Sequence, residues 1–323
     1  MELIRLKPIF KQTIWGGNKI KKEFSFSIDL DNIGECWMIS AHSNGDSIVT
    51  GCKYENMKLS ELYKNNRELF GNLDYDSFPL LTKIIDAKSD LSIQVHPDDD
   101  YAYKYENKSM GKTECWYVLA ADINSKIIIG HKAKDKNELE EMICNKKWIE
   151  LIREVPVKKG DFFMIEPGTL HAIKGGTLIL ETQESSDITY RVYDYDRLQN
   201  DKLRPLHIDK SLDVIKTPYI PTVPKINPDI TINSNMQQYA SCDSFTIWKL
   251  EVHGETNVIQ DQPCMLCTVI FGNGYINDEI VKKGDSFILP NGYGNVNLTG
   301  NMDIIVSSPK QKIRTKSICL KNC

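Results

Sequence analysis

Short segments in which apolar and polar side chains alternate recur along most of the chain. In the segment 91–96 every second residue is aliphatic, and Gln94 and His96 share the opposite, polar face. A period of two is typical of a β-strand that buries one face. Similar runs separated by Gly, Asn, Asp and Pro turns predict strands at 91–96, 114–119, 126–131, 161–165, 177–183, 188–193, 245–252, 265–271, 285–289 and 302–307. We therefore expect a mainly β fold.

Two segments have helical spacing instead. The segment Leu59 to Phe70 combines good helix formers with Ser60 as a candidate N-cap and Gly71 as a stop. The segment Lys136 to Arg153 places its apolar residues near helical spacing. Its lysine-rich middle predicts a division into two short helices.

A short motif occurs twice in the chain. The two copies are Val157-Lys-Lys-Gly-Asp-Phe-Phe163 and Val281-Lys-Lys-Gly-Asp-Ser-Phe287. Continuing both without gaps aligns Gly168 with Gly292 and His171 with Asn295. The spacing of the two glycines and the histidine resembles the second motif of cupin barrels. The repeat therefore predicts two related barrels, the second of which has lost its ligand histidine.

The boundary between the barrels is expected near 215–235, where Pro218, Pro221, Pro224 and Pro228 interrupt a polar stretch. We predict two cupin-like (jelly-roll) β-barrel domains with a few short helices. Residues 1–220 would form the metal-binding catalytic domain, and residues 221–323 a second, metal-free domain. The tail Lys310–Cys323 is interpreted as a solvated edge strand.

Composition and charge narrow the possible functions. With 41% hydrophobic and 26% charged residues the chain is in the ordinary globular range. No run approaches the ~20 apolar residues of a membrane helix, and Met1–Arg5 lacks the apolar core of a signal peptide, so we expect a cytoplasmic protein. The net charge of -4 does not favour nucleic-acid or membrane binding, so an anionic substrate would need local positive groups. The 9 scattered cysteines argue against a disulfide framework, and the close pair Cys264 and Cys267 is interpreted as two reduced thiols.

Three separate segments offer metal ligands. Gln94 and His96 lie on one strand face, Glu114 shares a face with Lys112, and His171 follows the turn 166–170. Nitrogen and oxygen ligands of this kind suit a borderline divalent ion, and we expect one Zn²⁺ per chain. The alternative is that His96 and His171 are structural, because two of the 6 histidines could fall in a strand and a turn by chance. Three segments with ligands on polar strand faces favour the metal site.

Several motifs together resemble the type I mannose-6-phosphate isomerases (phosphomannose isomerases), close to their short bacterial form. The matching segments are Pro8 with Ile14-Trp15-Gly16-Gly17, 33–37, 91–98, 111–117, 168–173 and 184–191. The resemblance extends from roughly the first ten residues to about residue 210 and is weaker in the C-terminal barrel. Long-form members have an extra helical domain between the Glu114 and His171 regions, where this chain has only the insert 132–156.

The resemblance implies interconversion of mannose 6-phosphate and fructose 6-phosphate, with a phosphorylated hexose as the partner. It implies zinc ligands at Gln94, His96, Glu114 and His171. It also implies active-site basic residues at Lys112 and Arg191. Such a reaction moves a proton between C1 and C2 through an enediol or enediolate and needs a base and stabilisation of developing charge.

Individual roles stay open at this stage. Arg191 suits bidentate contact with phosphate, and its alternative is a surface ion pair with Asp187 or Asp194. Lys112 suits stabilisation of an oxyanion. Glu181 is a candidate base because it shares a strand face with Gln183, and its alternative is a structural carboxylate.

Two other functional classes are considered. The first is a non-enzymatic, metal-stabilised cupin that binds sugars. The second is an iron-dependent dioxygenase, which the glutamine ligand and the lack of a His-x-His pair disfavour. No oligomer beyond a monomer or weak homodimer is expected.

Overall fold

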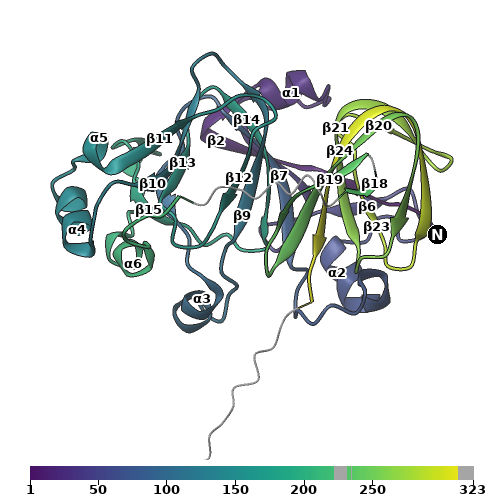
Figure 1. The fold of residues 1–323 in the computed structure, drawn as a ribbon, viewed down its shortest axis with the longest axis horizontal. Helices are drawn as coiled ribbons and strands as arrows, with labels where there is room; N and C mark the ends of the chain where they lie inside the picture. Colours follow the sequence, from purple (N-terminus) through teal and green to yellow (C-terminus); the bar gives the residue numbers. More distant parts are fainter. Residues whose placement is uncertain (222–230, 234, 312–323) are drawn as a thin grey trace, which may run out of the picture.

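The protein is described here from a computed structural model that covers residues 1–221, 231–233 and 235–311. It consists of two β-structures that lie side by side (Figure 1). Short helices lie at their edges, so the prediction of a mainly β fold with a few short helices is confirmed.

The first β-structure is a sandwich of two antiparallel sheets. The larger has the order β12 (Phe162–Ile165), β9 (Glu114–Ala121), β14 (Thr177–Glu184), β7 (Leu80–Ala87), β2 (Ile9–Gly17) and β3 (Ile33–Ile39). The smaller has the order β11 (Ile152–Pro156), β10 (Lys126–His131), β13 (His171–Ile173), β8 (Ile93–Val95) and β15 (Tyr190–Tyr193). Trp116 and Ile179 from the larger sheet pack with Ile129 and Ile173 from the smaller one. The space between the two sheets also holds the polar residues considered below.

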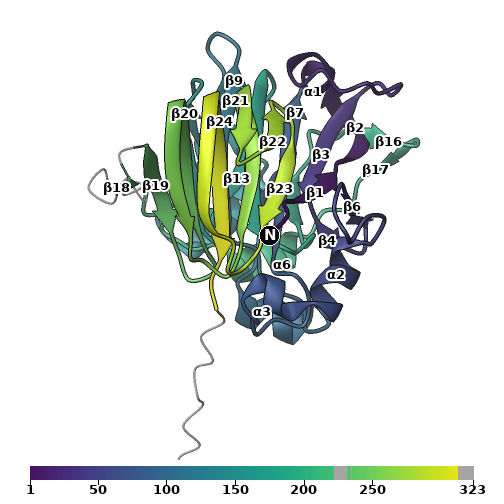
Figure 2. The same cartoon turned by 90° about the vertical axis from the view of Figure 1, so that its right-hand side faces the viewer.

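The second β-structure is one nine-stranded sheet that curls around its own core (Figure 2). Its order is β18 (Thr231–Asn233), β19 (Met236–Ser241), β20 (Phe245–Gln260), β24 (Gly294–Pro309), β21 (Met265–Ile276), β23 (Ser286–Leu289), β1 (Ile4–Lys7) and β6 (Ile48–Thr50), with β22 (Glu279–Lys282) paired to β21. Apolar side chains such as Trp248, Phe287 and Met302 fill this core.

The N-terminal strands β1 and β6 belong to the second sheet, although β1 precedes every strand of the first sandwich and β6 follows only β2 and β3. Ile4 pairs with Ile288 of β23, and Leu6 pairs with Val49 of β6. The nine-stranded sheet therefore contains strands from both sides of the expected boundary between residues 220 and 221. The division into two domains stays a prediction, and Pro224 and Pro228 lie outside the described residues.

The six-stranded sheet is buried on both faces. Leu178 and Leu180 point to a core shared with Phe245 and Leu266 of the second sheet. Ile179 and Glu181, one residue out of phase, face the smaller sheet of the first sandwich. Strand β7 consequently has all eight residues buried. The sequence of β7, Leu-Leu-Thr-Lys-Ile-Ile-Asp-Ala, lacks regular apolar–polar alternation, which explains why the sequence pattern did not predict it.

The predicted strands all contain strand structure, with some shifts at their ends. The segment 126–131 coincides with β10, whereas β20 and β24 extend well beyond the predicted 245–252 and 302–307. The segment 91–96 contains strand only at Ile93–Val95. Leu91 lies before that strand and lines the interior with Gln94 instead of facing outward with Ile93. Of the tail 310–323, residues 312–323 lie outside the described residues.

The two predicted helical segments are helical with corrected ends. The first forms α2 (Leu59–Asn65) and the 3₁₀ turn η1 (Arg67–Phe70), which ends at left-handed Gly71 with φ 64°. Ser60 is not the N-cap; Lys58 is, and the Ser60 hydroxyl donates to Asp46 at 2.5 Å. The second segment divides as predicted into α4 (Lys136–Cys144) and α5 (Trp148–Leu151), but residues 152 and 153 already belong to β11.

The remaining elements are short. They are α1 (Lys19–Glu23), α3 (Asp99–Tyr105), α6 (Ile208–Val214), β4 (Ala41–His42), β5 (Gly45–Asp46), β16 (Leu198–Gln199) and β17 (Lys202–Leu203). Helices α4, α5 and α6 lie beside the five-stranded sheet (Figure 1). Leu139 and Leu151 pack there with Ile93 and Val95. Within the described part of the chain, every helix is too short or too polar to cross a membrane.

The two copies of the repeat have the same local structure. Gly160 and Gly284 have φ of 91° and 96°. The carboxylates of Asp161 and Asp285 each accept a hydrogen bond at 2.9 Å from the backbone N–H three residues earlier. The turns lead into β12 and β23 of the two different sheets. The predicted repeat is therefore confirmed as a structural repeat.

The turn at Gly160 allows the cost of a positive φ to be measured without a steric clash. A Cβ added at Gly160 would meet no atom within 4 Å, so Gly160→Ala tests only the positive φ. We expect it to lower the free energy of unfolding by about 1–2 kcal/mol. Urea denaturation measures the change, and Lys159→Ala at the exposed neighbouring position should stay within about 0.5 kcal/mol of the wild type. Equal stabilities of the two variants would mean that the turn relaxes.

Candidate active site

The five-stranded sheet places three polar side chains on adjacent strands. His171 of β13 pairs directly with Gln94 of β8, and Gln94 pairs on its other side with Arg191 of β15. Directly paired residues point to the same face of a sheet, and all three line the cavity between the sheets. The register thus brings together residues that are 77 and 97 positions apart from Gln94 in the chain.

The six-stranded sheet forms the opposite wall. Glu181 of β14 is paired with Lys83 of β7 on one side and with Trp116 of β9 on the other. Glu114, the first residue of β9, pairs with Gln183 of β14. Period-two alternation places Glu181 and Gln183 on the same face of β14, as the sequence predicted. The two walls therefore meet with polar groups from both.

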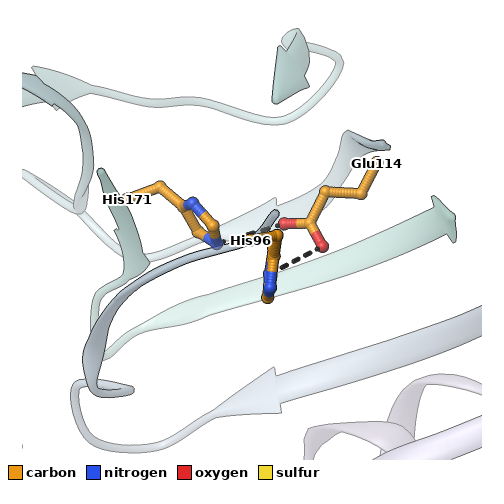
Figure 3. Close-up of side chains that lie close together, drawn as sticks. All are labelled: His96, Glu114 and His171. Atoms are coloured by element: carbon orange, nitrogen blue, oxygen red, sulfur yellow. Dashed lines mark ion pairs between the residues drawn. The ribbon is translucent and has the colours of Figure 1, made fainter. Parts of the chain in front are cut away.

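Three of the predicted ligands form a compact buried cluster, shown in Figure 3. One ligand atom each from His96, Glu114 and His171 lies within 4.8 Å of the others. The Nε2 atoms of His96 and His171 are 3.4 and 3.3 Å from the two carboxylate oxygens of Glu114. All three side chains are 1% exposed. This cluster is a possible metal-binding site.

Backbone carbonyls orient both imidazole rings. The Nδ1 atom of His96 is 2.8 Å from the carbonyl oxygen of Ile188, and that of His171 is 2.9 Å from the carbonyl oxygen of Thr169. A carbonyl only accepts, so each Nδ1 carries the proton and each Nε2 presents its lone pair to Glu114. Hydrogen-bonding of the far ring nitrogen is the usual arrangement for a histidine that binds a metal.

Gln94 completes the group from the five-stranded sheet. Its amide Nε2 is 3.3 Å from His171 Nε2, and its Oε1 accepts from the Ser92 hydroxyl at 3.2 Å. Rotating the amide by 180° would turn the carbonyl oxygen toward the cluster and the NH₂ toward Ser92, whose hydroxyl can also accept. Gln94 can therefore supply its amide oxygen as a fourth ligand without moving its backbone.

The protonation states of the cluster suit a cation. Burial, together with the nearby Lys112 ammonium, lowers the pKa of His96 to about 3, and burial also lowers the pKa of His171. Burial alone would raise the pKa of Glu114, but the Lys112 ammonium, 2.9 Å from Oε2, outweighs it and holds that pKa well below the ordinary value. The other carboxylate oxygen, Oε1, accepts no hydrogen bond from the described residues. Two neutral imidazoles and one ionised carboxylate with an available oxygen fit a divalent metal.

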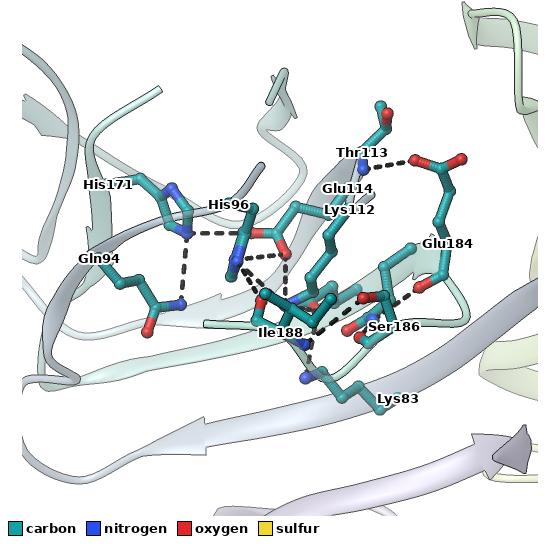
Figure 4. A network of polar contacts seen from close by, with 12 residues as sticks. Lys83, Gln94, His96, Lys112, Thr113, Glu114, His171, Glu184, Ser186 and Ile188 are labelled. Carbon is teal, nitrogen blue, oxygen red and sulfur yellow. Dashed lines mark hydrogen bonds and ion pairs between the residues drawn. The ribbon is translucent and has the colours of Figure 1, made fainter. Parts of the chain in front are cut away.

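Charges of alternating sign extend from this cluster across the cavity, and Figure 4 shows Glu114, Lys112 and Lys83 among them. Lys112 Nζ is 2.9 Å from Glu114 Oε2 and 3.9 Å from Glu181 Oε1. Lys83 Nζ is 3.2 Å from the same Glu181 oxygen and 3.6 Å from Glu35 Oε1. We refer to Glu35, Lys83, Glu181, Lys112 and Glu114 as the charge row. Alternation of sign keeps these largely buried charges compatible with one another.

Glu181 occupies the centre of the charge row, and its surroundings disfavour its ionised form. Burial raises its pKa, and the nearby negative charge of Glu114 raises it further. Its Oε2 accepts a hydrogen bond from the Trp116 indole at 3.2 Å, and its Oε1 lies beside the ammonium groups of Lys83 and Lys112. A buried carboxylate that faces a cavity and has a raised pKa is suited to act as a general base.

Two guanidinium groups lie at the other side of the cavity. Arg191 donates from Nη1 to the Pro205 carbonyl at 2.9 Å, and its buried Nε has no partner among the described residues. Arg204 donates from Nε to Asp194 at 2.7 Å and lines the same cavity. Burial, together with the positive charge of Arg204, lowers the pKa of Arg191.

The alternative in which Arg191 forms a surface ion pair finds no support in the contacts. Asp194 binds Arg197 and Arg204, and Asp187 lies 3.8 Å from His42. Within the described ranges no ion pair links Arg191 to either aspartate.

Sequence patterns had missed three residues of this cavity. Lys83 was missed because its strand was not predicted, although a lysine within the largely apolar segment 80–87 itself indicates a functional position. Glu35 lies in the segment 33–37, where its motif had been noted but no role assigned. Arg204 follows β17 in a connecting segment, and no local pattern indicates its orientation.

Comparison with known proteins gives consistent matches over both β-structures. Residues 3–117 match the family model described as phosphomannose isomerase type I, catalytic domain, and residues 235–309 match that of the mannose-6-phosphate isomerase cupin domain. The chain is 45% identical over 311 residues to mannose-6-phosphate isomerase ManA of Bacillus subtilis (strain 168), covering 95% of this chain and 98% of that protein. It is 43% identical to a mannose-6-phosphate isomerase of Streptococcus mutans, covering 93% and 98%.

A solved structure agrees with the fold described above. The crystal structure of the mannose 6-phosphate isomerase from Bacillus subtilis superposes with a TM-score of 0.91 at 41% identity, covering 95% of this chain and 99% of that one.

Proposed function

The chain belongs to the type I phosphomannose isomerase family, and from this premise we propose that it interconverts mannose 6-phosphate and fructose 6-phosphate as a zinc-dependent enzyme. The observation that carries the proposal is the buried His96–Glu114–His171 cluster in contact with Lys112. A metal-capable cluster joined to a row of ionisable groups in one cavity supports an isomerase that transfers protons beside a cation.

Gln94, His96, Glu114 and His171 would hold one Zn²⁺ ion. When bound, the ion would polarise the oxygens on C1 and C2 of the sugar as a Lewis acid. The nitrogen and oxygen donors match zinc better than Mg²⁺ or Ca²⁺, which prefer sites built from oxygen alone.

The protein side chains would supply the proton transfer. Glu181 is our candidate for the base that moves the proton between C1 and C2, because its pKa is raised and its carboxylate faces the cavity. Lys112, 3.9 Å from that oxygen, would stabilise negative charge on the enediolate. Both groups are fixed by buried partners, so little reorganisation is needed during the reaction.

A local positive balance supports a phosphorylated substrate. The charge row carries three carboxylates and two ammonium groups, so a bound Zn²⁺ leaves one net positive charge. Arg191 and Arg204 add two guanidinium groups to the cavity, and the single carboxylate of Asp194 is shared between Arg204 and Arg197. We propose that Arg191, with Arg204 beside it, binds the phosphate through its planar donor edge.

The alternative of a non-enzymatic sugar-binding cupin would need the metal but not the rest of the site. Buried Lys112 and Glu181 destabilise a fold unless they are compensated, and apolar residues would serve stability as well. Their presence beside the metal cluster favours the enzyme. The monomeric or weakly dimeric state and the cytoplasmic location stay predictions from the sequence.

A coupled assay tests the proposal directly. Zinc-loaded protein is expected to form fructose 6-phosphate from mannose 6-phosphate, with unphosphorylated mannose as a much poorer substrate. Calorimetric binding of mannose 6-phosphate without any turnover would instead support the sugar-binding alternative. Turnover that is equal for both sugars would refute the phosphate role of Arg191.

A further inference from the structure

Lys83 has no part in the scheme above, yet it lies in the wall of the cavity. It occupies the middle of β7, whose eight residues are all buried, and its side chain is 10% exposed. Its ammonium group lines the cavity between the sheets. An ammonium group in this position needs a reason because burial of charge is unfavourable.

The surroundings of Lys83 are symmetric. On one side Glu181 Oε1 is 3.2 Å from Lys83 Nζ, while the other oxygen of Glu181 accepts from Trp116 Nε1 at 3.2 Å. On the other side Glu35 Oε1 is 3.6 Å away, while the other oxygen of Glu35 accepts from Trp37 Nε1 at 2.6 Å. Each carboxylate is therefore held at one oxygen by an indole N–H and at the other by the shared ammonium.

Strand register produces this arrangement. Lys83 pairs directly with Glu181 of β14 and with Trp37 of β3, and Glu181 pairs directly with Trp116 of β9. Four neighbouring strands thus fix the positions of the carboxylates through their backbones. Stability does not require this ion pair, because well-packed apolar residues commonly replace buried ion pairs without loss.

We propose that Lys83 is a positioning residue that orients the carboxylate of Glu181 for proton transfer, with Glu35 as its counter-charge. This inference rests on the proposed isomerase function and on Glu181 as the base. Trp116 and Lys83 hold the two oxygens of Glu181 from opposite sides, which fixes the plane of the carboxylate. Without Lys83 the carboxylate would be free to rotate toward Lys112, which lies 3.9 Å from the same oxygen.

The test removes Lys83 together with the charge of Glu35, so that Glu181 keeps Lys112, 3.9 Å away, as its positive neighbour. The double substitution Lys83→Met with Glu35→Gln keeps the net charge and the approximate side-chain volumes. We expect kcat to fall roughly 10- to 100-fold, since misplacement of a catalytic group by about 1 Å has effects of this size. The KM for mannose 6-phosphate and the zinc content should stay within about twofold of the wild type, because neither residue is assigned to the substrate or the metal.

Two further readouts separate positioning from a general structural role. The isotope effect with C2-deuterated mannose 6-phosphate should increase, because proton transfer becomes more rate-limiting. In a Glu181→Gln background the same double substitution should cause no further loss of kcat. Effects that act through one group are non-additive in this way.

A matched pair elsewhere in the sandwich serves as control. Lys126 and Glu154 form an exposed ion pair at 2.8 Å on β10 and β11, so Lys126→Met with Glu154→Gln should leave kcat and the isotope effect unchanged. If the buried double variant does not fold, Lys83→Arg takes its place in the same cycle, because it keeps the charge and changes only the geometry.

Distinct results would overturn distinct claims. An equal loss of kcat in the wild-type and Glu181→Gln backgrounds, or no loss in either, would refute the positioning role of Lys83. A wild-type protein without isomerase activity would instead refute the proposed function itself.

Discussion

Replacing His171 by alanine is expected to remove the metal ion and the isomerase activity together. His171 Nε2 lies 3.3 Å from Glu114, and the Thr169 carbonyl orients its ring, so alanine at this position removes one of the proposed nitrogen ligands. Loss of a Lewis acid worth several kcal/mol should lower kcat/KM by about 10³-fold or more. Elemental analysis and the coupled assay measure both losses on the same preparation.

The repeat supplies the control for this variant. Asn295 is the residue that aligns with His171 in the second copy, and it is exposed near the start of β24. Asn295→Ala should keep the metal, the activity and the melting temperature of the wild type. If this substitution emptied the metal site, the assignment of the metal to the first sandwich would be wrong.

Prolonged chelation of the wild type should reproduce the loss seen in His171→Ala. Zn²⁺ is expected to restore activity better than Mg²⁺, because the proposed ligands include two imidazole nitrogens. Full activity in protein shown to be metal-free by elemental analysis would contradict the zinc-dependent mechanism while leaving the fold and the family unaffected.

The sequence predicted those parts of the site that local patterns encode. Period-two alternation placed Gln94 on the inner face of β8 and Glu181 with Gln183 on β14. The repeat predicted the shared turn geometry of Gly160 and Gly284. In each case the relevant information lies within about ten residues.

Features that depend on pairing between distant strands could not be predicted in this way. Lys83 meets Glu181 only because β7 and β14 are neighbours in a particular register, and register over such a distance has no local signature. Likewise, β1 is an ordinary short amphipathic strand, and nothing in residues 4–7 indicates that its partner is β23. The sequence of β7 also lacks regular alternation of apolar and polar residues, so the pattern did not predict this strand.

Arg191→Lys and Lys112→Ala are expected to impair catalysis while leaving the metal in place. A positive group that contacts phosphate or a developing oxyanion contributes a few kcal/mol to the transition state, so each substitution should lower kcat/KM by roughly 10²-fold. Neither residue is a proposed ligand, so zinc content should not change. Arg191→Lys keeps the charge but loses the planar donor edge, and for this reason it should not rescue activity.

The two variants should differ in how they respond to the substrate. If Arg191 binds phosphate, Arg191→Lys should narrow the ratio of kcat/KM between mannose 6-phosphate and unphosphorylated mannose. Lys112→Ala should lower kcat for both sugars alike, because Lys112 lies 2.9 Å from Glu114 at the metal cluster. Arg153→Lys is the matched control, since Arg153 donates to the Ile129 carbonyl and is not among the residues that line the cavity. Wild-type kinetics in both zinc-loaded variants would remove these residues from the mechanism, and the isomerase proposal would then rest on the metal cluster and Glu181.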